Sequence, residues 1–169
     1  MRELTIELDH QEGVYLADQK IKLDALSRCV RDYMSLNPET LTAQSSLLDA
    51  ALLLRRISLR HIPVLENDSL VGIITDRDVA RCAPSMLIPV SQEEYNKVFE
   101  DTPLSRIMTK NPIATTPDTP LTDAVVLFHE NRIGCLPVVE NGQLVGIITT
   151  TDLIRILYDL IVNPNNEQS

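Results

Sequence analysis

Two short motifs in this chain have residue types and spacing that could bind a nucleotide. Thr75 with Asp78, and Thr149 with Asp152, each place a threonine three residues before an aspartate where a helix is expected to begin. The free N–H groups and the dipole at a helix start favour a phosphate, and a carboxylate can accept hydrogen bonds from both hydroxyls of a ribose. The same spacing forms a capping box. The two interpretations are compatible, because cap and ligand can share atoms.

Each motif closes a longer stretch that occurs twice in the chain. Residues 62–78 and 136–152 both consist of two apolar strands, a tight turn and the start of a helix. The copies keep a constant offset of 74 positions, which takes Pro63 onto Pro137. Asn141-Gly142 is a strong hairpin signal, since both turn positions need positive φ. Function must therefore be sought in a doubled unit.

The surrounding pattern predicts a β-α-β-β-α repeat in an α/β (α+β) fold. Apolar spacing predicts a helix after Ser45 and another that starts at Thr119-Pro120, with proline at its first position. The apolar face of this second helix should consist of Leu121, Ala124, Val125 and Phe128. A single copy of about 50 residues would be marginal alone. The copies should therefore pack as a pseudo-twofold pair. The two repeats are predicted at 30–83 and 104–162. An extension at 1–29, with a strand at 3–8 and a helix from Lys22, precedes them. A connector at 84–103, with a helix near 91–100, joins them, and a disordered tail follows at 163–169.

Composition narrows the class of protein. A net charge of −9 argues against nucleic acid and anionic membranes as partners, and no apolar run is long enough for a membrane span. The N-terminus does not look like a signal peptide. Three scattered cysteines, Cys29, Cys82 and Cys135, indicate reduced thiols and a cytoplasmic protein.

The sequence gives little evidence of a catalytic site. His10, His61 and His129 are scattered, and no Ser-His-Asp or metal-ligand spacing is present. Cys135 begins an apolar strand and suits a small core residue better than a nucleophile. We therefore expect neither an enzyme, nor a metal site, nor an obligatory cofactor.

The doubled motif resembles a known family. Met-Ser/Thr-x-Asn-Pro, a helix, and then h-Pro-Val…Leu-Val-Gly-Ile-Ile-Thr-x-x-Asp, given twice over roughly residues 30–162, resembles a tandem pair of cystathionine beta-synthase (CBS) domains, a Bateman module, of the stand-alone bacterial type. The resemblance implies clefts between the repeats that bind AMP, ADP, ATP, NAD or S-adenosylmethionine. It also implies a dimer and a regulatory role.

The resemblance implies the following ligand-binding residues. In the first repeat they are Pro38, Arg60, His61, Pro63, Thr75, Arg77 and Asp78; in the second they are Asn111, Pro112, Ile113, Ala114, Arg132, Pro137, Thr149, Thr150 and Asp152. The two aspartates would bind ribose, and the extended segments after Asn37 and Asn111 would line the base pocket.

The two clefts should differ in charge. In the family, basic residues at the position of Arg60 and His61 contact phosphates, whereas the second repeat has Gly134 and Cys135 there. Arg132 could partly substitute. The preceding Arg55-Arg56 is explained by a solvated helix end, where cations favour the C-terminal dipole. The base pockets differ too, because Ile113-Ala114 offers an apolar wall where the first repeat has the polar Glu39-Thr40.

The last helix, expected at 150–162, is apolar on more than one face, which predicts a homodimer that buries it.

The sequence thus favours a ligand-sensing module that binds an adenosine nucleotide or related ligand and signals to an unknown protein partner. The alternative is a structural or dimerisation subunit whose clefts stay empty.

Overall fold

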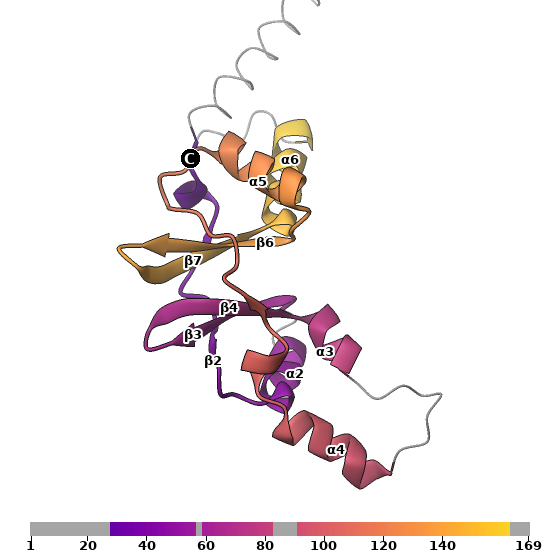
Figure 1. Ribbon diagram of the computed structural model, residues 1–169. Coiled ribbons are helices and arrows are strands. Elements are labelled where there is room, and N and C mark those ends of the chain that lie inside the picture. Colours follow the sequence, from indigo (N-terminus) through magenta and orange to yellow (C-terminus); the bar gives the residue numbers. More distant parts are fainter. Residues whose placement is uncertain (1–27, 57–58, 83–90, 163–169) are drawn as a thin grey trace, which may run out of the picture. The chain divides into compact units, whose positions relative to one another are not determined.

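The computed structural model describes residues 28–56, 59–82 and 91–162 (Figure 1). The predicted strand at 3–8, the start of the predicted helix at Lys22 and the tail at 163–169 lie outside the described residues. The chain divides into two compact units. The first unit comprises residues 1–34, 117–134 and 149–169, and the second comprises 35–116 and 135–148.

The described elements alternate helix and strand as the doubled pattern predicts, which confirms the mixed architecture with two β-α-β-β-α repeats. In chain order they are η1 (Val30–Asp32), β1 (Ser35–Leu36), β2 (Leu41–Thr42), α2 (Leu47–Arg56), β3 (His61–Glu66), β4 (Ser69–Thr75), α3 (Asp76–Cys82), α4 (Gln92–Asp101), η2 (Leu104–Arg106), β5 (Thr109–Lys110), α5 (Leu121–Asn131), β6 (Cys135–Glu140), β7 (Gln143–Thr149) and α6 (Thr150–Val162).

The hairpin turns follow the chemistry of their residues. Asn141 and Gly142 have φ of 51° and 82°, and Asn67 and Asp68 have φ of 48° and 62°. Positive φ at both central positions matches the twist of the flanking strands, and Asn, Asp and Gly tolerate it best. Both hairpins, β3–β4 and β6–β7, therefore form where the sequence predicts them.

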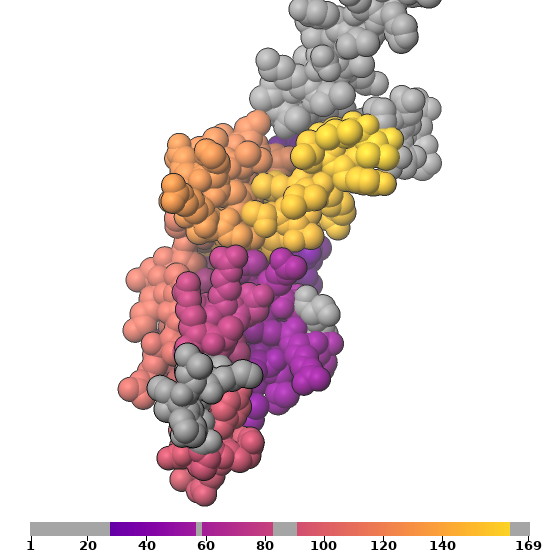
Figure 2. All heavy atoms as spheres, turned by 90° about the vertical axis from the view of Figure 1, so that its right-hand side faces the viewer, coloured from indigo at the N-terminus to yellow at the C-terminus, as the bar shows by residue number. Residues whose placement is uncertain are grey.

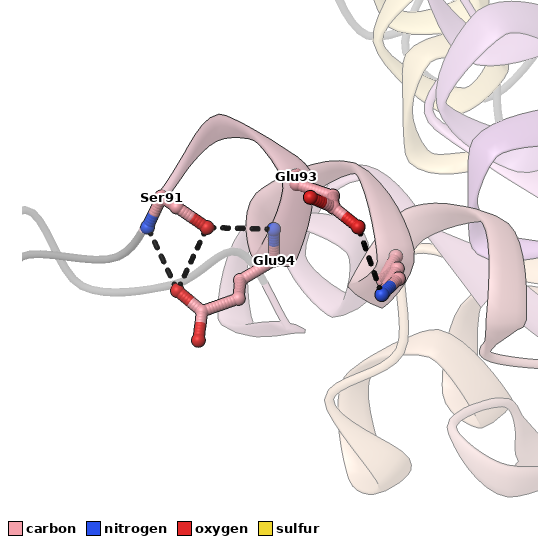
Figure 3. Close-up of polar contacts among 4 residues, drawn as sticks. Ser91, Glu93 and Glu94 are labelled. Carbon is pink, nitrogen blue, oxygen red and sulfur yellow. Dashed lines mark hydrogen bonds and ion pairs between the residues drawn. The ribbon is translucent and has the colours of Figure 1, made fainter.

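Reciprocal caps start most of the helices. Ser46 and Asp49 cap α2, with the Ser46 N–H donating to Asp49 Oδ2 at 2.8 Å and the Asp49 N–H to Ser46 Oγ at 3.1 Å. Ser91 and Glu94 form the same box on α4, as Figure 3 shows. Each box satisfies backbone donors that have no partner inside the helix.

The hairpins extend into two sheets that exchange strands between the repeats. The sheet orders are β2-β3-β4-β5 and β1-β7-β6. β5, which leads into the second repeat, pairs antiparallel with β4 of the first, and β1 pairs in the same way with β7. Each repeat therefore completes the sheet of the other.

Burial explains why the fourth strand is a continuous apolar run. Ile74 belongs to the core cluster that includes Ala50 and Leu54 of α2 and Leu104 of η2. Ile73, on the opposite face of the strand, clusters with Cys135 and Ile147 of the other sheet. A strand buried on both faces cannot alternate apolar with polar residues.

Three local expectations are wrong. The apolar spacing that predicts a helix from Lys22 extends to Val30 and Tyr33, but Cys29 is extended, with φ −113° and ψ 168°, just before the short 3-10 helix η1. Pro120 is the N-cap of α5, not its first residue. Val125, expected on the buried face of α5, is 44% exposed, whereas Leu121, Ala124 and Phe128 are buried. These three residues are three and four positions apart and form the buried stripe of α5, whereas Val125 lies at the edge of that stripe.

Candidate functional site

The first Thr-x-x-Asp motif forms a compact set of hydrogen bonds at the junction of β4 and α3. Asp78 Oδ2 accepts from the Thr75 N–H at 2.9 Å and from the Thr75 hydroxyl at 2.6 Å. The Asp78 N–H in turn donates to Thr75 Oγ1 at 3.2 Å. The other carboxylate oxygen, Oδ1, receives no hydrogen bond from the described residues. Asp78 is half-buried, so this oxygen can accept further hydrogen bonds.

The second motif repeats the two hydrogen bonds from the threonine to the aspartate and has one further contact. Asp152 Oδ2 accepts from the Thr149 N–H at 2.9 Å and from the Thr149 hydroxyl at 2.8 Å. Here Oδ1 also accepts from Arg155 Nη2 at 3.2 Å. The Arg155 side chain is 62% exposed and the Asp152 side chain is 13% exposed. Sequence reasoning missed Arg155, although its spacing of three residues from Asp152 on a helix was a readable signal.

A group of charged residues surrounds the first motif. His61 lies opposite Thr75 in the β3–β4 register, and the Asp76 N–H donates to the Arg60 carbonyl at 3.3 Å. Desolvation lowers the pKa of His61, the negative charge of Asp76 opposes this, and the positive charges of Arg60 and Arg77 reinforce it. These residues therefore lie close enough to act on one another and on a bound anion.

The second repeat has the same backbone without those charges. The Thr150 N–H donates to the Gly134 carbonyl at 3.1 Å, which reproduces the contact between Asp76 and Arg60. Cys135 is buried in a core cluster, as expected for a small core residue. Thr150 is exposed. Arg132, the proposed substitute cation, is the exposed C-cap of α5 with a left-handed backbone.

The two extended segments also match each other. Asn37 and Asn111 both have positive φ, 47° and 48°. The Asn37 N–H donates to the Val145 carbonyl at 3.3 Å, and the Asn111 N–H donates to the Val71 carbonyl at 3.2 Å. Each asparagine therefore turns its chain away from the strand of the other repeat.

The residues after these turns remain available for contact. Pro38 and Pro112 are half-buried, and Ile113 and Ala114 are exposed, with Ile113 39% exposed. Pro63 and Pro137, by contrast, are fully buried in their strands. Their side chains fill the core, so any contact they make with a ligand would use the backbone.

The predicted site residues are distributed over both units. The second unit brings together the Thr75–Asp78 pair with Arg60, His61 and Arg77, and it also holds Pro38, Pro63, Asn111, Pro112, Ile113, Ala114 and Pro137. The first unit holds Arg132 and the pair formed by Thr149 and Asp152, together with Thr150.

The described residues also bear on two other kinds of site, a metal site and a membrane-spanning helix. In the parts of the chain that the structure describes, no group of three or more His, Cys, Asp or Glu side chains could hold a metal ion. Among the helices of those parts, none combines the length and the apolar character that crossing a membrane requires.

Comparison with known proteins identifies the doubled unit. The family model described as CBS domain matches residues 30–85 and 104–159. A CBS domain-containing protein of Dictyostelium discoideum is 31% identical over 134 residues, which cover 78% of this chain and 92% of that protein. With two larger curated relatives the match spans only 18% of the relative's length.

Solved structures agree with this comparison. A Vibrio cholerae protein assigned to acetoin utilization (AcuB) is 31% identical, with a TM-score of 0.68 over 84% of this chain and 98% of that one. The CBS domain pair of protein MJ0100, solved with 5′-methylthioadenosine and S-adenosyl-L-methionine, is 29% identical, with a TM-score of 0.64 over 77% of this chain and 95% of that one.

Proposed function

Because this chain belongs to the CBS domain family and carries the domain twice, we propose that it is a ligand-sensing regulatory module that binds an adenosine nucleotide or a related adenosyl ligand. The observation that carries the proposal is Oδ1 of Asp78, which receives no hydrogen bond from the described residues and is held in place by the two hydrogen bonds from Thr75 to Oδ2. A carboxylate fixed in this way can accept both hydroxyl protons of a ribose. The adenosyl ligands bound by the related pair of MJ0100 support the same ligand class.

Charge favours a phosphorylated ligand for the first repeat. The positively charged Arg60 and Arg77 lie around the Thr75–Asp78 pair, together with His61, which is neutral at pH 7 because burial lowers its pKa. The equivalent positions of the second repeat, Gly134, Cys135 and Thr151, carry no charge. We assign AMP, ADP, ATP or NAD to the first set of residues, and a ligand with less negative charge, of the S-adenosylmethionine type, to the second.

We propose that a bound ligand is signalled to another protein and that the module catalyses no reaction itself. We also propose that the module is a cytoplasmic homodimer. Exposed apolar side chains on α5 and α6 support the dimer: Val125, Val126, Ile154, Leu157, Tyr158, Ile161 and Val162 are each 44% to 68% exposed. Figure 2 shows α6 in yellow beside α5 in orange at the surface of the first unit. An apolar face of this kind marks a protein interface. The three free cysteines suit a reducing compartment.

A thermal-shift screen of AMP, ADP, ATP, NAD and S-adenosylmethionine tests the ligand class. A ligand present at a hundred times its Kd stabilises the folded state by about 2.7 kcal/mol. We expect at least one of the five to raise Tm and Asp78→Ala to reduce the shift produced by the phosphorylated ligands. Asp49→Ala is the matched control, because Asp49 caps α2 with the same geometry but lies outside the site.

The rival function, a structural subunit, predicts a different outcome. Capping boxes also start α2 and α4, where no ligand role is proposed. If none of the five compounds raises Tm, and Asp78→Ala and Asp49→Ala lower Tm by similar amounts, the Thr-x-x-Asp motifs are caps only. The structural interpretation then replaces the sensor.

A further inference from the structure

The two ribose-binding candidates differ in one contact that their sequences do not distinguish. Arg81 and Arg155 occupy equivalent positions, each three residues after the aspartate of its motif. Arg155 donates to Asp152 Oδ1 at 3.2 Å. Arg81 makes no ion pair with Asp78 in the described structure. The same residue type at the same spacing therefore engages one aspartate and leaves the other open.

The number of hydrogen bonds that a carboxylate can accept gives this difference a consequence for ribose binding. Each carboxylate has about four acceptor positions, two on each oxygen. Thr149 fills both positions on Asp152 Oδ2 through its N–H and hydroxyl. Thr75 does the same on Asp78 Oδ2. A ribose diol, which donates two hydrogen bonds, can use both positions on Oδ1 of Asp78, whereas Arg155 already holds one on Asp152.

We propose that Arg155 is a specificity-determining residue that competes with ribose for Asp152 Oδ1 and makes the second repeat the weaker adenosyl site. This inference rests on the proposed ligand class. A ribose that binds there with both hydroxyls must displace the guanidinium. Arg155 bonds to Oδ1 whereas Thr149 bonds to Oδ2, so the exposed Arg155 side chain can leave without disturbing the Thr149–Asp152 cap.

Exposure limits the size of the effect. The Arg155 side chain is 62% exposed, so solvent screens its attraction for Asp152. An exposed ion pair of this kind shifts an affinity by at most about fivefold. We therefore expect removal of Arg155 to tighten ribose binding at the second repeat by about two- to fivefold.

The experiment isolates the second repeat and uses an uncharged probe. In an Asp78→Ala background the first site is disabled, and calorimetric titration with adenosine measures the second. Adenosine has no phosphate that Arg155 could attract, so it reports only on the ribose. We expect Arg155→Ala to lower the adenosine Kd and Arg81→Ala to leave it unchanged. With 2′,3′-dideoxyadenosine, which lacks the diol, Arg155→Ala should have no effect.

Each remaining outcome overturns a specific statement. An adenosine Kd that is unchanged or raised by Arg155→Ala would refute competition by Arg155. An equal gain for the dideoxy compound would refute the role of the diol. If adenosine binds neither the wild-type chain nor the Asp78→Ala chain, and none of AMP, ADP, ATP, NAD and S-adenosylmethionine raises Tm, the proposed function itself falls. Arg155→Gln, which keeps a polar chain on the helix, replaces the alanine variant if that variant is poorly folded.

Discussion

A methyl group added at Gly72 would come within 2.4 Å of the Met108 sulfur and 2.9 Å of Met108 Cγ. The two residues meet because β5 pairs with β4, with Lys110 opposite Gly72. Met108 immediately precedes β5, on the segment that the second repeat contributes to the sheet of the first. The missing side chain at position 72 therefore leaves room for the Met108 side chain that the strand exchange brings there.

Gly72→Ala should destabilise the protein by about 1 kcal/mol, because the flexible Met108 side chain must leave its present rotamer to make room for the new methyl group. Urea denaturation measures the loss. In the double variant Gly72→Ala, Met108→Ala, the second substitution removes the clash. The loss of unfolding free energy in the double variant should therefore be smaller than the sum of the losses in the two single variants.

Gly142→Ala is the matched control. Gly142 has φ of 82° with nothing near its virtual Cβ, so an alanine there is strained by the backbone alone. Its effect should be independent of Met108→Ala. Full additivity at Gly72 would contradict the packing explanation.

Replacing Thr115 by valine should stabilise the protein. Thr115 is 7% exposed, and its hydroxyl has no hydrogen-bond partner among the described residues. A buried unsatisfied hydroxyl costs about 1–3 kcal/mol, and valine keeps the shape without it. The first repeat already has Leu41 at the equivalent position. The free energy of unfolding in urea should rise for Thr115→Val. Thr42→Val, which removes a hydroxyl bonded to Ser45, should not stabilise the protein.

The free energy of unfolding should fall as the pH is lowered, because His61 is buried. Burial lowers the pKa of His61 below its ordinary value of about 6.5. The unfolded chain then binds a proton at higher pH than the folded chain, so His61 contributes stability that is complete above about pH 6.5 and is lost as the pH falls through the lowered pKa. Unfolding measured at about pH 7.5 and about pH 5.5 should show a smaller drop for His61→Gln than for the wild type. Equal drops would exclude His61 as the source.

A charge on α6 should dissociate the proposed dimer. Leu157 is 54% exposed in the single chain and belongs to the apolar face proposed as the interface. Leu157→Glu would bury an unpaired carboxylate there, which is strongly unfavourable. Light scattering should give the mass of a dimer for the wild type and of a monomer for Leu157→Glu. Asn96→Glu adds the same charge on the exposed helix α4 and should leave the mass unchanged. A monomeric wild type would refute the dimer.

The sequence by itself determined the elements whose causes are local. The constant offset of 74 positions, the hairpin at Asn141-Gly142 and the capping boxes each depend on residues within a few positions of one another. The helix predicted at 150–162 is α6 with the same bounds. The family could also be identified from this pattern, because its motif consists of turn, strand and cap residues in a fixed order.

Only the tertiary structure decided how distant segments combine. Nothing in the sequence of β5 says that it pairs with β4 of the other repeat, because that register depends on a shared sheet. The exposure of Val125 depends on which neighbours cover α5. Arg81 and Arg155 are alike in sequence, and only the folded chain pairs one of them with its aspartate. Local chemistry thus placed the two Thr-x-x-Asp motifs, and the packing around them made the two sites unequal.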